Sequence, residues 1–397
     1  MEQIITCKLK LVLTEEQKAD LLYTVQQYNK AMNFVLQDNF TDKLTNDKKL
    51  HPKYYSILKE NFHLNSQTAI NVYRHSGHIY KTRWTRAKTK RDYSIFDKPP
   101  IYKALTMKYT FNRNISIFKA GMLLSISSLN SRIKHIQLKG WKKHYDLIQY
   151  CKLSDPMLKY DKNKKEFYLL LPITVNVEEQ KHKSIIGLDS GIRNPIVAAS
   201  HNEVKFYDKP EIIKERKTKI QEKRQELYSK GTRSSKRRLK SMSRRERLFV
   251  SDWSHCLAKQ VISDFPSALF IMEDLTDIRQ NTSTFRKEKE DRRQREQWNF
   301  VEIQDKIAYK SVLYSGIRTE KIDPAYTSQT CPECGYVSED NRSKGSEIFT
   351  CQNCGLTKNA DEVGAINIRF KGLTVSQPHC SERQTSSNKP TNLFVGS

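Results

Sequence analysis

The chain has 397 residues, with 70 Lys or Arg against 44 Asp or Glu, so its formal net charge is +26. That length allows two or three domains with sizeable cores. The charge favours a polyanionic partner, with nucleic acid ahead of a membrane surface, and no run of about 18 or more apolar residues exists to span a membrane.

The first residues predict a strand followed by a capped helix. Apolar and polar side chains alternate over residues 5–13, which is the pattern of a strand. Thr14 precedes Gln17 by three residues, the spacing of a capping box. Apolar residues then recur at about 3.6-residue spacing over residues 21–36, which predicts the helix.

No signal peptide is expected at the start of the chain. Lys8 and Lys10 interrupt the apolar run, and no small-residue cleavage site follows. The eight cysteines are therefore expected as reduced thiols or metal ligands, not disulfides. Cys7, Cys151 and Cys256 stand singly and are interpreted as ordinary thiols.

Helical patterns continue to about residue 90, and short strand-like segments fill residues 105–175. The last two of these segments form a predicted hairpin around the polar residues 161–165. Residues 1–182 are thus interpreted as a β unit built from both ends of the segment, with a helical insertion at about residues 15–100.

A second region begins at residue 183 and mixes apolar strands with long helices. SIIGLD ends at Asp189 and ALFIME ends at Glu273, with charged helices predicted between them over residues 210–264. The polar residues 276–298 predict a mobile linker. A helix with a glycine stop at Gly316, and then a further strand, lead to the cysteines.

Four cysteines follow a C-x2-C-x16-C-x2-C pattern that is specific for zinc. They are Cys331, Cys334, Cys351 and Cys354. Four thiolates complete a tetrahedral Zn²⁺ site with no open position, so one structural zinc is predicted. Gly335 and Gly355 follow the two knuckles and allow tight turns. Such a ribbon occurs in nucleic-acid-binding proteins of many kinds, so it is weak evidence for catalysis.

Three carboxylates stand at the ends of predicted elements: Asp189 and Glu273 end strands, and Asp361 begins a helix. Any one of them alone is more often a turn former or helix cap, by roughly three to one. Together they could hold two Mg²⁺ ions about 4 Å apart for phosphodiester hydrolysis.

The order strand-Asp, basic helices, strand-Glu, helix, zinc module, Asp-helix resembles a RuvC-like nuclease of the RNase H fold. GLDSGIRNP, FIMEDL and NADEVGAINI are similar to the three RuvC motifs of the TnpB family, and DPAYTSQTCPECG with FTCQNCG is similar to its zinc ribbon. The resemblance covers residues 183–370. It departs from the family at Val363, which replaces a common Asn, and at Asn359 and Ala360, which replace Asp-Arg.

The resemblance implies an α+β multidomain fold. It assigns residues 1–182 to a wedge-like β-barrel with a helical recognition insertion, 183–330 to RuvC-like motifs I and II, 331–354 to the zinc ribbon, 355–370 to motif III and 371–397 to a disordered tail. It makes Asp189, Glu273 and Asp361 the catalytic ligands of two Mg²⁺ ions.

Residues 214–247 contain 15 Lys or Arg and 4 Glu, a net charge of +11. A charge run is usually a solvated face, but this one has too few acids to pair with itself, and nucleic acid is favoured by about three to one. The candidate nucleic-acid-binding residues are Arg233, Lys236, Arg237, Arg238, Lys240, Arg244, Arg245 and Arg247. His255, Tyr309, Lys310 and Tyr314 are expected to pack inside the fold.

The function that the resemblance implies is Mg²⁺-dependent, RNA-guided cleavage of double-stranded DNA beside a short flanking motif. A guide RNA from the transposon end would recognise the target by base pairing, and the protein would be cytoplasmic and nucleoid-associated in a prokaryote. The alternatives are a zinc-ribbon nucleic-acid-binding regulator without cleavage, a DNA transposase, or a type V CRISPR effector. The oligomeric state is left open, and no membrane partner is expected.

Overall fold

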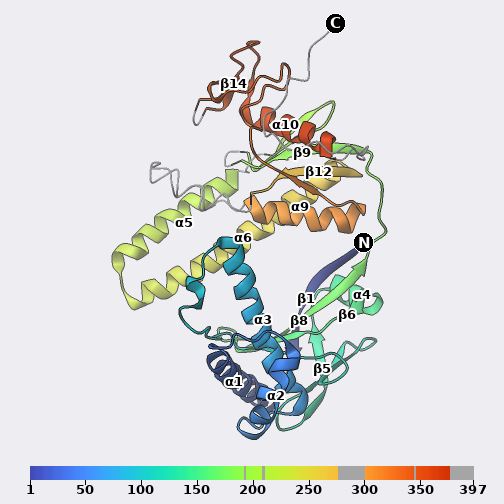
Figure 1. Cartoon of the computed structure of the whole chain (residues 1–397), viewed down its shortest axis with the longest axis vertical. Coiled ribbons are helices and arrows are strands. Elements are labelled where there is room, and N and C mark those ends of the chain that lie inside the picture. Colours follow the sequence, from blue (N-terminus) through green and yellow to red (C-terminus); the bar gives the residue numbers. More distant parts are fainter. Residues whose placement is uncertain (192–193, 208–210, 276–299, 344–345, 376–397) are drawn as a thin grey trace. The chain divides into compact units, whose positions relative to one another are not determined.

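The structure is a computed structural model that describes residues 1–191, 194–207, 211–275, 300–343 and 346–375 (Figure 1). The chain divides into two compact units, Glu2–Asn176 and Val177–Ser397, and Met1 belongs to the second. The predicted linker, residues 276–298, falls outside the described residues. Among the described helices, none combines the length and the hydropathy needed to cross a membrane.

The N-terminal unit is built around one antiparallel sheet whose central strands come from its two ends. β1 (Glu2–Val12) pairs with β8 (Glu166–Asn176) from Glu2↔Asn176 to Lys10↔Tyr168. The sheet order is β2-β7-β8-β1-β5-β4-β3, with β6 also against β8. The other strands are β2 (Thr106–Lys108), β3 (Ile115–Phe118), β4 (Leu123–Ser127), β5 (Arg132–Lys139), β6 (Lys152–Leu153) and β7 (Met157–Asp161).

Helices α1 (Glu15–Asp38), α2 (Asp47–Glu60) and α3 (Ser66–Lys90) fill the insertion between β1 and β2. The predicted capping box is confirmed: the Gln17 amide donates to the Thr14 hydroxyl at 3.3 Å, and the Thr14 amide donates to the Gln17 side chain at 3.1 Å. Helix α4 (Lys142–Tyr150) has no counterpart in the prediction, because it is short and buries only Ile148 fully.

The C-terminal unit contains a five-stranded sheet in the order β11-β10-β9-β12-β13. Its strands are β9 (Ser184–Asp189), β10 (Ile196–Ala199), β11 (Val204–Tyr207), β12 (Ala268–Glu273) and β13 (Glu320–Ile322). β12 pairs in parallel with β9 and with β13, whereas β10 pairs antiparallel with β9 and with β11. Parallel strands need long crossovers, and α5 (Glu211–Lys230) with α6 (Arg233–Asp264) supplies the one between β9 and β12.

Helices cover both faces of this sheet (Figure 1). On one face, Leu188 and Met272 belong to a buried cluster with Val261 of α6 and Ile307 of α9 (Phe300–Ser315). On the other, Ile271 clusters with Ile368 of α10 (Ala360–Val375). Side chains alternate between the faces of a strand, so both strand surfaces are apolar, as the continuous runs SIIGL and ALFIM predict.

Helix α10 approaches the sheet closely at two glycines. A Cβ on Gly187 of β9 would overlap the carbonyl oxygen of Ala365 and the amide of Arg369, and a Cβ on Gly372 would overlap the Ile271 side chain. The predicted start of the disordered tail is therefore wrong by a few residues. Residues 371–375 form the last turn of α10, where Gly372 lies against Ile271 of β12, whereas 376–397 fall outside the described part.

The zinc-ribbon segment contains the hairpin of β14 (Ile348–Thr350) and β15 (Thr357–Asn359), which leads directly into α10. Helix α9 ends at Gly316, as predicted: its φ is +66°, and its amide donates to the Val312 carbonyl at 3.0 Å. Glycine suits this left-handed position at the end of a helix.

Replacing Gly187 with alanine is expected to destabilise the C-terminal unit by about 1–3 kcal/mol, because the new methyl group would meet backbone atoms that have no room to move. Urea unfolding measures the change. Gly121→Ala is the matched control, since its Cβ would meet only side chains at 3.3–3.4 Å. Equal unfolding midpoints for wild type and Gly187→Ala would show that the contact is not tight.

Candidate active site and zinc centre

Asp189 and Glu273 lie side by side at the carboxyl ends of adjacent parallel strands. The register pairs Leu188 with Met272, so the next residue of each strand is the carboxylate. By alternation both acids share the face of Gly187 and Ile271, which is the face that α10 covers.

Asp361 lies in the first turn of α10. The Asn359 side-chain oxygen accepts from the amides of Asp361 and Glu362, at 2.9 and 3.3 Å, and so caps the helix. The Asp189 side chain lies against the same part of α10, because a Cβ added to Gly364 would be only 3.0 Å from Asp189 Oδ2. The three predicted acids therefore gather at one end of the sheet, from three elements far apart in the sequence.

Burial, together with the nearby negative charges of Glu273 and Asp361, raises the pKa of Asp189 to about 8, although the Arg342 guanidinium opposes this shift. Burial also raises the pKa of Glu273, while a hydrogen bond from Thr327 opposes this. Burial and neighbouring negative charges both favour the protonated form of a carboxyl group, and a bound cation would favour the ionised form.

The carboxylates suit cations held at separate positions. Within the described part of the chain, the four cysteines are the only set of three or more His, Cys, Asp or Glu ligand atoms that all lie within 4.8 Å of one another. The three carboxylates are thus spaced more widely than one coordination shell. Carboxylate oxygens are the kind of ligand that Mg²⁺ prefers.

Two neighbours of Asp361 were not identified from the sequence. Asn194 donates from Nδ2 to Asp361 Oδ2 at 3.1 Å, and Arg342 Nη2 lies 3.5 Å from Oδ1. Asn194 belongs to the quoted motif GLDSGIRNP, so its position near Asp189 was a usable signal. Arg342 lies between the two knuckles, and nothing in its spacing shows that the ribbon turns it back toward the acids.

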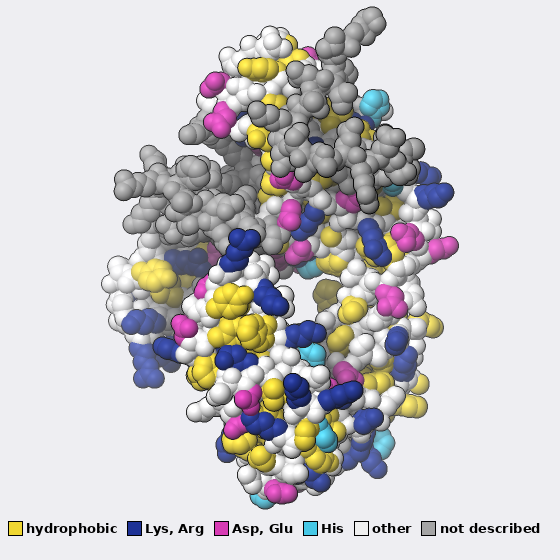
Figure 2. Space-filling view, viewed as in Figure 1, with side chains coloured by type: hydrophobic (Ala, Val, Ile, Leu, Met, Phe, Trp, Pro, Cys, Tyr) yellow, Lys and Arg dark blue, Asp and Glu magenta, His cyan; other side chains and the backbone are white. Residues whose placement is uncertain are grey.

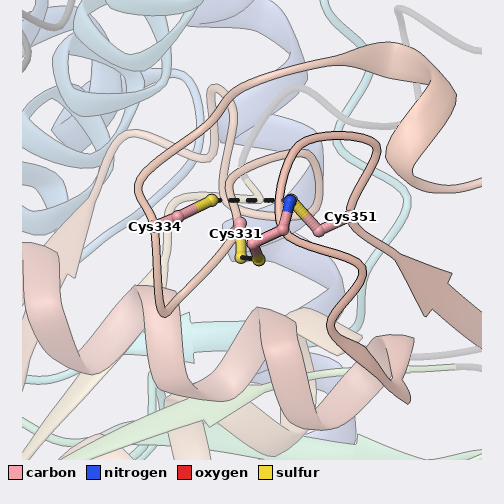
Figure 3. Close-up of side chains that lie close together, drawn as sticks. Cys331, Cys334 and Cys351 are labelled. Atoms are coloured by element: carbon pink, nitrogen blue, oxygen red, sulfur yellow. Dashed lines mark hydrogen bonds between the residues drawn. The ribbon is translucent and has the colours of Figure 1, made fainter.

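The four cysteine side chains point toward one another (Figure 3). The sulfurs of Cys331 and Cys354 are 3.6 Å apart, and those of Cys334 and Cys351 are 3.5 Å apart. A tetrahedral zinc with bonds of about 2.3 Å separates its sulfurs by about 3.8 Å. The site therefore fits zinc with little movement. The φ angles of Gly335 and Gly355, +72° and +75°, confirm that both turns use the left-handed region.

The ribbon shares a core with the helix that carries Asp361. Phe349 and Val363 are fully buried in one cluster with Cys331, Cys351 and Ala360. The departure from the family pattern at Val363 is thereby explained, because the side chain packs against the ribbon. Asn359, the other departure, is the cap of α10.

The eight candidate nucleic-acid-binding residues are all exposed on α6. They lie on the first half of this helix, which packs against α5, and an ion pair of 2.7 Å between Arg224 and Glu246 joins the two helices. Figure 2 shows Lys and Arg side chains gathered at the far end of this hairpin. A solvated basic surface of this kind is suited to phosphate contact.

Packing roles are confirmed for three of four residues between α6 and α9. His255 Nδ1 lies 3.0 Å from the Tyr309 hydroxyl, and the buried Lys310 ammonium donates to the His255 carbonyl at 2.5 Å. Tyr314 is 52% exposed, so its predicted burial is wrong. It lies in the last turn of α9, after the buried stripe of that helix has ended.

Comparison with known proteins shows several relatives. A family model described as the Cas12f1-like TNB domain matches residues 300–368. A TnpB-like protein of Methanocaldococcus jannaschii is 33% identical over 43% of this chain and 60% of its own length. A second TnpB-like protein of that organism is 28% identical over 58% of this chain and 51% of its own. The chain thus spans about half of the length of these curated relatives.

A CRISPR-associated endodeoxyribonuclease, Cas12f1 of Sulfoacidibacillus thermotolerans, is 42% identical over 26% of this chain and 22% of its own length. Among solved structures, Cas12f1 in a complex with sgRNA and target DNA has a TM-score of 0.63 at 17% identity, over 90% of this chain and 83% of that one. The mini-RNA-guided endonuclease CRISPR-Cas phi3 has a TM-score of 0.57 at 11% identity, over 95% and 93%. At these identities the structures show a shared fold.

From the four-cysteine site we expect one zinc ion per chain. Removing one of the cysteines should release the zinc and disorder the start of α10, where Asp361 lies. Cys331→Ala should release the metal and lower the activity of the folded protein, because the ribbon core holds α10. Zinc content is measured by mass spectrometry of the metal. Cys256→Ala, which removes an exposed thiol, is the control. A folded, zinc-free and fully active Cys331→Ala would contradict the bracing role.

The raised pKa of Asp189 predicts a pH-dependent cost in the metal-free protein. The folded state keeps a proton that the unfolded state loses above the ordinary pKa of 3.8, so stability falls as pH rises from about 4 to about 8. Asp189→Asn removes this dependence, so the variant should be more stable than wild type at pH 8 by at least about 1 kcal/mol, with a smaller difference at pH 5. Urea unfolding in buffer without added Mg²⁺, which leaves zinc in place, measures both. Parallel pH profiles would refute the burial of this acid.

Proposed function

We propose that this chain is a member of the TnpB family and an RNA-guided DNA endonuclease that hydrolyses phosphodiester bonds with two Mg²⁺ ions. The observation that carries the proposal is the convergence of Asp189, Glu273 and Asp361 at one end of the sheet. A pure binding protein has no evident need for three acids gathered so that two of them raise the pKa of the third.

The metal ions would be held by these three carboxylates and would supply an activated water and charge stabilisation for the leaving oxygen. The chain's own residues set the geometry. Asn194 and Arg342 orient the carboxylate of Asp361, and Arg342 also offsets the negative charge around Asp189. No Ser or Cys nucleophile is needed, because the attacking group is water.

The partners in this proposal are a guide RNA from the transposon end and double-stranded target DNA. Base pairing would recognise the target, while the protein would read a short flanking motif and the shape of the heteroduplex. The exposed Lys and Arg residues of α6 offer phosphate contacts, which predicts binding that weakens steeply with salt. The N-terminal unit would act as the wedge-like barrel with a helical recognition insertion, and the protein would be cytoplasmic.

The relatives support this proposal: two are TnpB-like proteins, and one is a CRISPR-associated endodeoxyribonuclease. A solved complex of shared fold contains sgRNA and target DNA. A transposase that joins DNA ends would use the same carboxylates, and strand-transfer products would identify it.

Asp189→Asn should lower guide-dependent cleavage at least about 100-fold, because a neutral amide cannot replace an anionic metal ligand. The assay combines the protein, its co-purified RNA, target DNA and Mg²⁺. Asp340→Asn, at an exposed acid of the ribbon, is the matched control and should cleave like wild type.

Persistent cleavage by Asp189→Asn would remove this acid from the site. If the wild-type protein binds its RNA and target DNA but does not cut the DNA, whichever divalent metal is supplied, the alternative of a binding regulator would be favoured.

A further inference from the structure

Residues 323–330 connect β13 to the first zinc knuckle and pass beside Glu273. Thr327, in the middle of this loop, is only 3% exposed. Its hydroxyl lies 2.5 Å from Glu273 Oε1 and 2.8 Å from the Pro324 carbonyl. A hydroxyl has one proton, and the carboxylate is the stronger acceptor. Thr327 therefore donates to Glu273.

Helix α10 holds this loop through two side chains one turn apart. Asn367 Nδ2, on a residue that is 5% exposed, donates to the carbonyls of Thr327 at 2.8 Å and Thr330 at 2.7 Å. Lys371 donates to the carbonyls of Asp323, at 3.2 Å, and Ala325. Residues four apart share one helix face, so a single face of α10 satisfies four loop carbonyls.

The loop conformation is also strained. Tyr326 has a φ of +64°, in the left-handed region that bulky side chains rarely adopt. Its carbonyl accepts from the amides of Gln329 and Thr330, both at 3.1 Å. A strained residue that its surroundings hold in place often marks a functional position, and this one directly precedes Thr327.

We infer that Thr327 and Asn367 are positioning residues that tie the rotamer of Glu273 to helix α10. Asp361 lies on the same helix, so one rigid element then sets both the second and the third carboxylate. The inference deepens the proposed function and rests on it for the cleavage readout, but the metal-binding readout below is independent of guide RNA and DNA.

The test compares Thr327→Val, which keeps the shape and removes the hydroxyl, with Thr327→Ser, which keeps the hydroxyl. Loss of an outer hydrogen bond to a metal ligand typically costs 10–100-fold in affinity or activity. We expect Thr327→Val to weaken Mn²⁺ binding to the full-length protein, measured by electron paramagnetic resonance, by that factor and to lower the cleavage rate of the RNA-loaded protein similarly. Thr327→Ser should restore both.

Asn367→Ala should produce the same loss, and combining it with Thr327→Val should add little, because the two residues act on Glu273 in series. Unchanged zinc content and circular dichroism establish that the variants are folded. Wild-type Mn²⁺ affinity in Thr327→Val, or failure of Thr327→Ser to restore it, would overturn the inference. Weakened Mn²⁺ binding in Thr327→Val, beside a wild type that does not cleave DNA, would refute the proposed function and leave the inference standing.

Discussion

The packing of α10 on β9 and β12 is the contact on which the rest of the candidate site depends. β9 and β12 place Asp189 and Glu273 next to each other through backbone register alone. The third acid has no such register, and its position depends on how closely the helix approaches the sheet. Gly187 and Gly372 permit that approach, because a side chain at either position would push the helix outward. Two residues without side chains thus help to determine where the third carboxylate lies.

The zinc ribbon stabilises the start of the same helix. A small module with few apolar residues gains most of its stability from the metal, and here its core includes Val363 of α10. The ribbon also contributes Arg342, which contacts Asp361, and the loop before it contributes Thr327, which contacts Glu273. A zinc held by the four cysteines would have no open position for chemistry. It would order a segment that contacts two of the three acids.

The candidate active site is acidic, although the protein as a whole is strongly basic. A chain with a net charge of +26 gathers three half-buried carboxylates at one end of a sheet. Without a bound cation this grouping costs stability, since the charges of Glu273 and Asp361 disfavour ionisation of Asp189. Such a cost is characteristic of functional sites, and binding of cations would recover it. The basic surface of α6 serves the opposite purpose, because it is solvated and costs little.

By itself the sequence predicted most of the helices and strands and the residues of the two candidate metal sites. Alternating or continuous apolar runs identified the strands, the Thr14 box and the Gly316 stop identified helix ends, and the CxxC spacing identified zinc, because each signal is local. The start of the tail and the exposure of Tyr314 were misjudged, since the first depends on Gly372 packing against Ile271 and the second on where α9 leaves the sheet. Only the tertiary structure brought Arg342, Asn194 and Thr327 to the acids, and Asn367 to the loop that carries Thr327. Those contacts join residues up to 167 positions apart, and a side-chain hydrogen bond across such a distance leaves no periodicity or spacing in the chain.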